Sequence, residues 1–279
     1  MQRKQNNMGR VSILAVLPLV TFCTSAQEVA QSPREAAWAA IDKSLRAGDV
    51  DHRRQAAVAL ATIDPTNQQA VDRLTKALRD DKSARMRQQA ALALGLMKAK
   101  QSIPALKDAL EDSTEVAFAA AKSLTDLGDL GGQGLLVAVL SGERKDTPGI
   151  MTNARREAET KLHHPGGLVL MGAEDGIGSL FGPAGMAVTA VQDISDLHGK
   201  GAPGRAAAAA YLAKDSDPYA VTLLEWALTD DNSFVRVEAA KGLGQRGNAD
   251  SIPKLMPLLK DGKNSVRTMA AAAIIRLTP

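Results

Sequence analysis

The hydrophobic positions of the chain recur with the spacing of amphipathic helices. Leu74, Ala77 and Leu78 share one helical face. The same spacing returns in three further segments, 103–110, 221–228 and 252–259. We place a proline near the first turn of each of these helices, where it removes no hydrogen bond: Pro65, Pro104, Pro218 and Pro253. The pattern therefore predicts several short helices, each followed by a turn rich in Asp, Gly, Asn and Ser.

A second pattern follows each of these helices. It consists of an apolar residue, Arg, two variable residues, Ala-Ala, a variable residue, a small residue and Leu or Ile. Its copies start at residues 52, 86, 116, 204, 235 and 266, so the successive offsets are 34, 30, 88, 31 and 31. A helix, a tight turn and a second helix, repeated in this way, cannot bury their apolar faces alone. The chain is therefore predicted to be all-α, an α-solenoid of about seven stacked antiparallel helix pairs.

The V-R-x-x-A-A-x-A-L helix after an acidic turn resembles the short bacterial HEAT-like repeat, which is also found in phycobiliprotein lyases. The resemblance covers most of residues 35–279 and implies an ARM/HEAT-like superhelix, but the scaffold hosts unrelated activities. The 88-residue offset is close to three periods, so we expect divergent repeats at 130–213 with the solenoid axis continuing through them. Within them, residues 166–182 form a glycine-rich insertion, interpreted as a loop over a solenoid ridge or as a partner-contacting loop.

The N-terminus has the pattern of a secretory signal peptide. Arg3, Lys4 and Arg10 precede an apolar stretch from residue 11 to residue 22, and small residues follow. We therefore expect residues 1–26 to be a signal peptide that packs against nothing, 27–34 a disordered linker and 35–279 the solenoid. The mature protein would be periplasmic or extracellular. An uncleaved anchor and a lipoprotein modified at Cys23 are the alternatives; Phe22 disfavours the second.

The charge balance changes once the leader is removed. The whole chain has 34 Lys and Arg against 31 Asp and Glu, and the leader holds three of the bases and no acid. The mature chain is thus neutral, and aromatic residues are only 3% of the sequence, so nucleic acid is not an expected partner. Cys23 is the single cysteine, which leaves no disulfide or thiol chemistry in the mature chain. The apolar stretch of the leader is too short for a comfortable membrane span, and the mature chain has none.

Catalytic and metal-binding patterns are absent from the sequence. The resemblance includes deoxyhypusine hydroxylase, which binds iron through His-Glu dipeptides, but none of the four histidines here precedes glutamate. We expect no catalytic residue, no cofactor and no metal. The recurring arginines 53, 87, 205, 236 and 267 could line a basic groove. Asp81, Asp230 and Asp261 instead favour an Arg–Asp ladder between successive repeats, the arrangement that the resemblance implies.

The function predicted from this architecture is a non-enzymatic, monomeric scaffold that binds an unknown protein or peptide along its concave surface. Helical phase places a set of second-helix side chains outward, as candidate partner-binding residues: Arg54, Gln55, Gln88, Gln89, Phe118, Lys122, Glu238, Lys241 and Met269. The alternatives are a phycobiliprotein-lyase-like tetrapyrrole lyase or isomerase, suggested by the resemblance alone, and a structural protein of the cell envelope.

Overall fold

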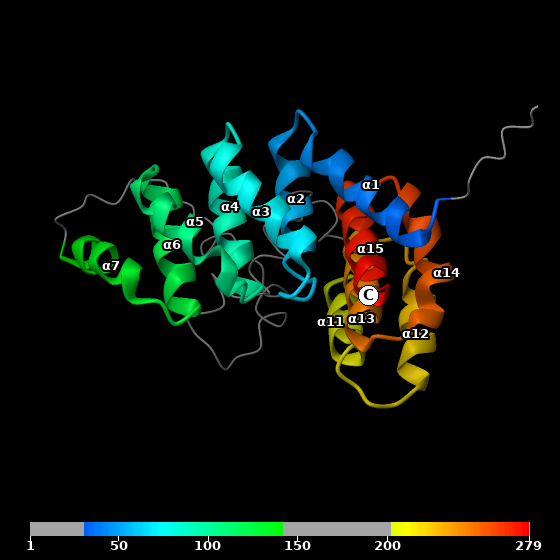
Figure 1. Ribbon diagram of the computed structural model, residues 1–279. Helices are drawn as coiled ribbons and strands as arrows, with labels where there is room; N and C mark the ends of the chain where they lie inside the picture. The colour runs from blue at the N-terminus through cyan, green and yellow to red at the C-terminus, as the bar shows by residue number, and fades with distance from the viewer. Residues whose placement is uncertain (1–30, 142–201, 279) are drawn as a thin grey trace, which may run out of the picture. The chain divides into compact units, whose positions relative to one another are not determined.

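The computed structural model describes residues 31–141 and 202–278, which fold into helices and turns without a strand (Figure 1). The expected leader, the glycine-rich insertion at 166–182 and the central part of the divergent repeats lie outside these residues. All described residues belong to one unit, Gln31–Pro279. None of their helices is long and apolar enough to cross a bilayer.

The second helices match the predicted repeats closely. They are α2 (Val50–Leu60), α4 (Ala84–Leu96), α6 (Thr114–Asp126), α11 (Ala202–Leu212), α13 (Ser233–Arg246) and α15 (Asn264–Leu277). Each begins two residues before the start of its sequence pattern. The prediction of a regularly repeated second helix is therefore confirmed at all six copies.

The first helices are more varied, and some are interrupted by 3₁₀ turns. They are α1 (Pro33–Leu45), α3 (Gln68–Asp80), α5 (Ile103–Asp108) with η1 (Lys100–Ser102) and η2 (Ala109–Glu111), α7 (Gln133–Leu140) with η3 (Leu130–Gly132), α12 (Tyr219–Ala227), and α14 (Ile252–Leu255) with η5 (Ala249–Ser251) and η6 (Met256–Lys260). The described residues contain five complete pairs, and α7 and α11 border the undescribed stretch. The expected total of seven pairs extends into that stretch.

Two boundaries differ from the sequence prediction. Pro104 and Pro253 lie in a first helical turn as expected, but Pro65 lies in the turn before α3, because Asn67 caps that helix by accepting the amide of Ala70. Helix α1 begins at Pro33, so the last two residues of the expected linker are helical. Ser32 and Glu35 fix this start with a reciprocal capping box, which also lowers the pKa of Glu35.

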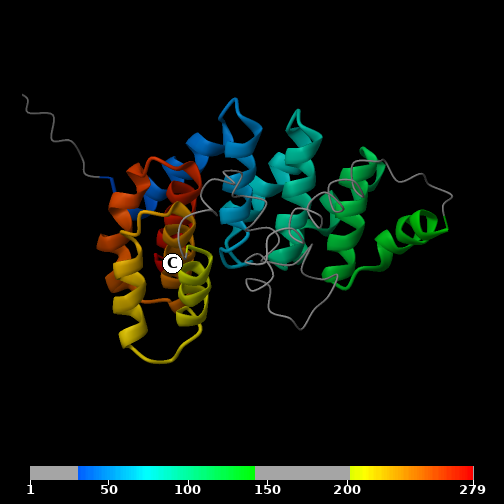
Figure 2. The ribbon, with the colours of Figure 1, turned by 180° about the vertical axis from the view of Figure 1, so that it is seen from behind.

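The second helices pack side by side in an order that differs from the order of the chain. Helix α13 packs against both α11 and α15, while α4 packs against both α2 and α6. Helix α15 also packs against α1 and α2, as Figures 1 and 2 both show. The order along the row is therefore α11, α13, α15, α2, α4, α6. The last repeat of the chain is the direct neighbour of the first, which the sequence did not lead us to expect.

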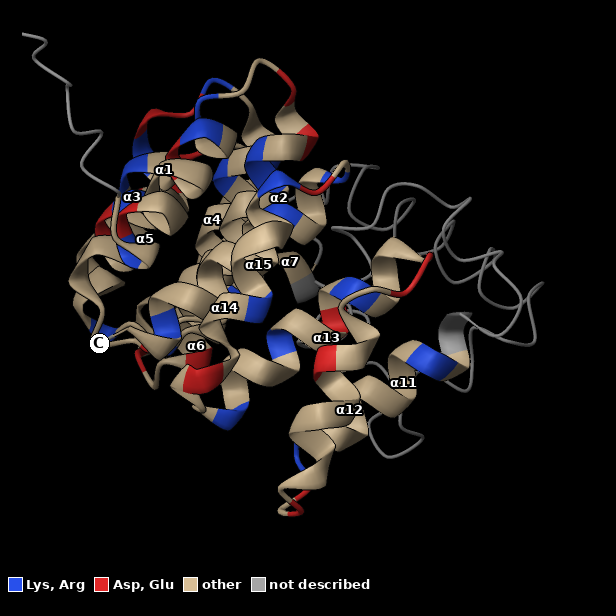
Figure 3. Cartoon of the chain, turned by 90° about the vertical axis from the view of Figure 1, so that its right-hand side faces the viewer, with Lys and Arg blue, Asp and Glu red and all other residues tan. Residues whose placement is uncertain are grey.

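The predicted Arg–Asp ladder is present between neighbouring repeats. Its bidentate pairs, with Arg Nε to Asp Oδ2 distances of 2.7 to 2.9 Å, are Arg53–Asp81, Arg87–Asp112, Arg205–Asp230 and Arg236–Asp261. In three of these pairs the remaining guanidinium nitrogen donates to carbonyls of the turn before its own helix. Basic and acidic segments lie close together around the turns above α1 and α2 (Figure 3). The arginines are structural side chains rather than the lining of a basic groove.

The ladder is interrupted where the last repeat meets the first. Arg267 donates to the carbonyls of Asp261 and Gly262 and to Asn264 Oδ1, and no carboxylate pairs with it among the described residues. The position that corresponds to Asp81, Asp230 and Asp261 is Ala47 in the first repeat. We call this contact between α15 and the α1–α2 pair the seam. Different hydrogen bonds join it: Ser44 Oγ donates to Asn264 Oδ1 at 3.1 Å, and Arg276 donates to the carbonyl of Thr62 at 2.8 Å.

Candidate partner-binding surface

Six of the predicted partner-binding residues are partly exposed on the row of second helices, and four of these, Lys241 among them, make polar contacts within the chain. Arg54 pairs with Asp51, Lys122 pairs with Asp126, and Gln55 accepts a hydrogen bond from Asn264 at the seam. Gln88 and Phe118 are partly exposed as well. These side chains are accessible in part, but polar contacts within the chain already hold Arg54, Gln55 and Lys122.

The outward orientation predicted for three other residues is wrong. Gln89 is 4% exposed, Glu238 is 6% exposed and Met269 is 4% exposed. Glu238 pairs with the partly exposed Lys241 at 3.2 Å. The physical reason is the packing of the row, since α4, α13 and α15 each lie between two other second helices that cover both of their flanks. Helical phase alone does not show how many positions of a second helix its neighbours bury.

A surface that the sequence did not indicate lies on α11 and α12. Tyr211 is 74% exposed, Tyr219 is 63% exposed and Trp226 is 73% exposed. The whole chain has only two tyrosines and two tryptophans, so three of these four residues are exposed on this pair of helices. Tyr219 and Trp226 are seven residues apart on α12 and therefore share a face. Together with Asp231 we call these residues the aromatic surface.

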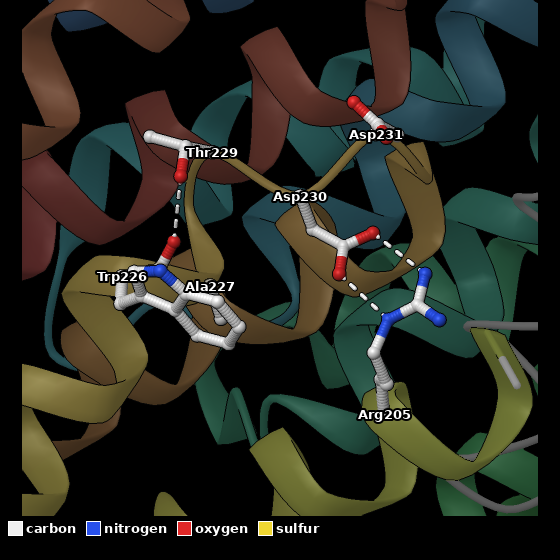
Figure 4. A pocket seen from close by; sticks show the side chains of 6 residues that line it. All are labelled: Arg205, Trp226, Ala227, Thr229, Asp230 and Asp231. Carbon is white, nitrogen blue, oxygen red and sulfur yellow. Dashed lines mark hydrogen bonds and ion pairs between the residues drawn. The ribbon is translucent and has the colours of Figure 1, made fainter.

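A hollow of about 370 Å³ lies beside Trp226 (Figure 4). It is lined by Arg205, Trp226, Ala227, Thr229, Asp230 and Asp231. Arg205 and Asp230 form a bidentate ion pair in its wall, with Nε–Oδ2 and Nη2–Oδ1 distances of 2.7 and 2.9 Å. The hydrogen bond from Arg205 holds the pKa of Asp230 below its ordinary value and raises that of Arg205. Both groups therefore stay charged and neutralise each other.

The other polar groups at the hollow have different roles. Thr229 Oγ1 donates to the carbonyl of Trp226 at 2.9 Å, which fixes the backbone at the end of α12. The exposed Asp231 carboxylate makes no ion pair or hydrogen bond with the residues described. The indole of Trp226 and the carboxylate of Asp231 both line the hollow, but their side chains lie apart (Figure 4). Each can interact with a cationic side chain, the ring through its face and the carboxylate through an ion pair.

The aromatic surface was missed because its residues follow a core-like pattern. Positions 219, 223 and 226 repeat with helical spacing among apolar neighbours, so they are indistinguishable from a buried stripe. The available signal was compositional: aromatics are rare in this chain, yet three lie within sixteen residues. Within the described residues, no group of three or more His, Cys, Asp or Glu side chains is placed to hold a metal ion.

Comparisons with known proteins are consistent with this fold. The chain matches the HEAT repeats over residues 39–140 and 202–276, which is more than half of its length. Two solved structures align with it. The complex of CpcE and CpcF of phycocyanin lyase from Nostoc sp. PCC7120 is 22% identical, with 92% of this chain and 100% of that chain covered and a TM-score of 0.33. Human deoxyhypusine hydroxylase in complex with glycerol is 20% identical, with 88% and 97% covered and a TM-score of 0.34. No curated protein sequence matches the chain.

Proposed function

Because the chain belongs to the HEAT-repeat family, we propose that it is a non-enzymatic scaffold that binds a partner protein or peptide, and that the aromatic surface is its contact site. The observation that carries this proposal is the exposure of Tyr211, Tyr219 and Trp226 together. Large aromatics that are left in water are costly in a monomer, and in complexes they supply most of the binding energy. The second helices offer a partner less accessible surface, since the predicted partner-binding positions on them are buried or partly buried.

The charge around the aromatic surface defines the class of partner. Between residues 211 and 231 the chain has five acidic residues, at 215, 217, 225, 230 and 231, and one basic residue, Lys214. Arg205 neutralises Asp230, but Asp231 remains unpaired among the described residues. We therefore assign the site to a segment that combines aliphatic and basic residues. Basic residues of the partner would lie on the indole of Trp226 and pair with Asp231.

Affinity capture from periplasmic or culture extract, with bound proteins identified by mass spectrometry, tests this function. We expect a discrete partner on the wild-type chain and its loss on Trp226→Ala, with binding at least about tenfold weaker, as is usual for a central interface tryptophan. Leu130→Ala is the matched control, because Leu130 is also exposed, at 71%, but lies on η3. A free peptide of alternating leucine and lysine should compete for the site. Capture that Trp226→Ala leaves unchanged would rule out the aromatic surface.

Export of the protein is a further part of the proposal. The basic, apolar and small-residue segments of residues 1–26 motivate it. Cell fractionation should place the protein outside the cytoplasm, with a mature mass that corresponds to cleavage near residue 26. An intact N-terminus in the cytoplasmic fraction would contradict it. A change in the visible spectrum on addition of bilin or haem would instead favour a tetrapyrrole-binding role.

A further inference from the structure

A second hollow, of about 800 Å³, lies between α1 and α3, the first helices of neighbouring repeats, and shares no residue with the aromatic surface. It is lined by Arg34, Glu35, Trp38, Ala39, Asp42, Lys43 and Arg46 of α1 or the turn after it, and by Gln69 and Arg73 of α3. We call it the α1–α3 groove. Its residues on α1 repeat at intervals of three or four, so they form one face of that helix.

Arg73 bridges the two helices at the base of the groove. Its Nε and Nη2 atoms bind the two oxygens of Asp42 at 2.7 and 3.1 Å, and its guanidinium carbon lies 4.2 Å from the centre of the Trp38 ring. Its Nη1 atom donates to the carbonyl of Gln69. Arg73 and Asp42 thus bind each other, and Arg73 also contacts Trp38 and Gln69. We therefore expect these two side chains to stay fixed when a ligand binds.

Two hydrogen-bond donors in the groove have no acceptor. The indole Nε1 of Trp38 and the Nη1 atom of Arg34 are buried, and neither has a hydrogen-bond partner among the described residues. Trp38 itself is only 8% exposed. Leaving a buried donor unpaired costs about 1–3 kcal/mol, so native proteins rarely tolerate two in one place. Residues 34 and 38 are one helical turn apart, so a single carboxylate could accept from both once the side chains that cover these two atoms move aside.

The charge of the groove favours the same ligand chemistry. Four basic residues and two acidic ones line it, and the Glu35 carboxylate is already bound in the capping box of α1. Arg34 and Lys43 have no acidic partner among the described residues. The groove thus has a net positive charge next to two unpaired donors. Its volume is much larger than an inorganic anion requires, and it suits a stretch of several residues.

From these observations we propose that the α1–α3 groove binds an acidic peptide segment of a partner protein, with one carboxylate held by Arg34 and Trp38. A guanidinium and a carboxylate form the strongest class of hydrogen bond in proteins. The groove shares no residue with the aromatic surface, and it selects the opposite charge. The proposals for the two sites can therefore be tested independently of each other.

Tryptophan fluorescence offers a direct test on the full chain. The protein has two tryptophans, so a Trp226→Phe background leaves Trp38 as the only emitter. The probe is an end-capped peptide of eight glutamates, with eight glutamines as the neutral control and inorganic phosphate as the free-anion control. We expect a saturable change in Trp38 emission with the glutamate peptide alone.

Variants separate the groove from general electrostatic attraction. Arg34→Gln should weaken binding of the glutamate peptide at least about tenfold, because it removes a charged donor. Arg85→Gln is the matched control, since Arg85 is an exposed arginine on α4 that does not line the groove. Unfolding curves of each variant detect a loss of fold. Calorimetric titration detects peptide binding that leaves the Trp38 emission unchanged. Equal binding by both variants, no binding by wild type, or an equal response to phosphate would each overturn the proposal.

Discussion

The ladder arginines differ in how deeply they are buried, and this difference determines what each contributes. Arg53 is 5% exposed; besides Asp81, it donates to the carbonyls of Ala47 and Gly48. Its removal would leave the nearly buried Asp81 carboxylate with the amide of Ser83 as its remaining donor, and two carbonyls without the donor that Arg53 supplies. Arg79 pairs with Asp108 across the outer helices, but both side chains are more than half exposed. The same kind of ion pair therefore has a different energetic role at the two positions.

We predict that Arg53→Ala lowers the free energy of unfolding by about 3 kcal/mol or more, because breaking a buried pair leaves one charge unpaired. Arg79→Ala should change it by only about 0–1 kcal/mol, since water solvates the exposed Asp108. Urea unfolding followed by circular dichroism measures both. Equal costs for the two variants would contradict the structural role of the buried ladder.

The ladder also makes stability depend on pH at Asp112. The hydrogen bond from Arg87 holds the pKa of Asp112 below its ordinary value of 3.8. A carboxyl whose pKa is lowered by folding stabilises the protein above its unfolded pKa. That contribution is lost as the pH falls through the folded value. The effect of the Arg87–Asp112 pair is therefore complete near neutral pH and disappears in acid.

Replacing Arg87 with glutamine should make the protein less stable near neutral pH. The difference from wild type should shrink as the pH falls below about 4, where Asp112 takes up a proton in both proteins. The backbone amide of Ser113 still bonds to Asp112 in the variant, so some lowering of its pKa persists. Urea midpoints measured from neutral to acid pH give the comparison. A difference that does not vary with pH would mean that the pair contributes through packing alone.

At the scale of the element, small residues set how closely the helices approach. Helices α4 and α6 meet at Gly95 and Ser123; a Cβ added at Gly95 would lie 2.5 Å from Ser123 Oγ and 2.7 Å from its Cβ. Ser123 is buried and donates to the carbonyl of Ala91 at 2.9 Å, so it cannot move without losing that bond. Gly134 in α7 has no atom within 4 Å of the corresponding position.

Gly95→Ala should therefore destabilise the protein by about 1–3 kcal/mol, because the added methyl forces α4 and α6 apart. Gly134→Ala should be neutral or stabilising by up to about 1 kcal/mol, since alanine is the better helix former and has room. Thermal unfolding of the two variants beside wild type tests the contrast. A Gly95→Ala protein as stable as wild type would show that the two helices pack more loosely than described.

The helices themselves could be predicted from the sequence because their signals are local. The apolar slot, the arginine and the Ala-Ala pair place the start of α13 and α15 within two residues, and the acidic turns before them identify the ladder. Burial within the row was not predictable to the same degree. Glu238 and Met269 occupy positions in the repeat that would be exposed on an isolated helix pair, and the neighbouring second helices bury them.

For the whole molecule, no local signal determines which repeat stacks on which. Repeats with similar faces can in principle be neighbours in many orders, so chain order is the natural expectation. The seam does leave a trace in the sequence, since Ala47 stands in the first repeat where a ladder aspartate is expected, and Arg267 pairs with no carboxylate among the described residues. This gap resembles an ordinary end of a repeat array. Only the contact of α15 with α1 and α2 shows that the last repeat of the chain lies against the first.

An engineered disulfide tests the seam in the intact chain. Ser44 Oγ and Asn264 Oδ1 lie 3.1 Å apart although the residues are 220 positions apart in sequence. In a Cys23→Ser background, the Ser44→Cys and Asn264→Cys pair should therefore form a disulfide under mild oxidation. By restricting so long a loop in the unfolded chain, an unstrained bond should stabilise the protein by about 5 kcal/mol.

A second cysteine pair controls for collisions of a flexible chain. Ser83 lies at the start of α4, on the far side of α2 from α15, so Ser83→Cys with Asn264→Cys should remain reduced under the same oxidant. Mobility on a non-reducing gel and the mass of proteolytic fragments distinguish the two pairs. If the repeats stacked in chain order, residues 44 and 264 would lie near opposite ends of the array and neither pair would close. A disulfide confined to the first pair requires α15 to lie against the first repeat in solution, because no other order of the described helices brings those two positions together.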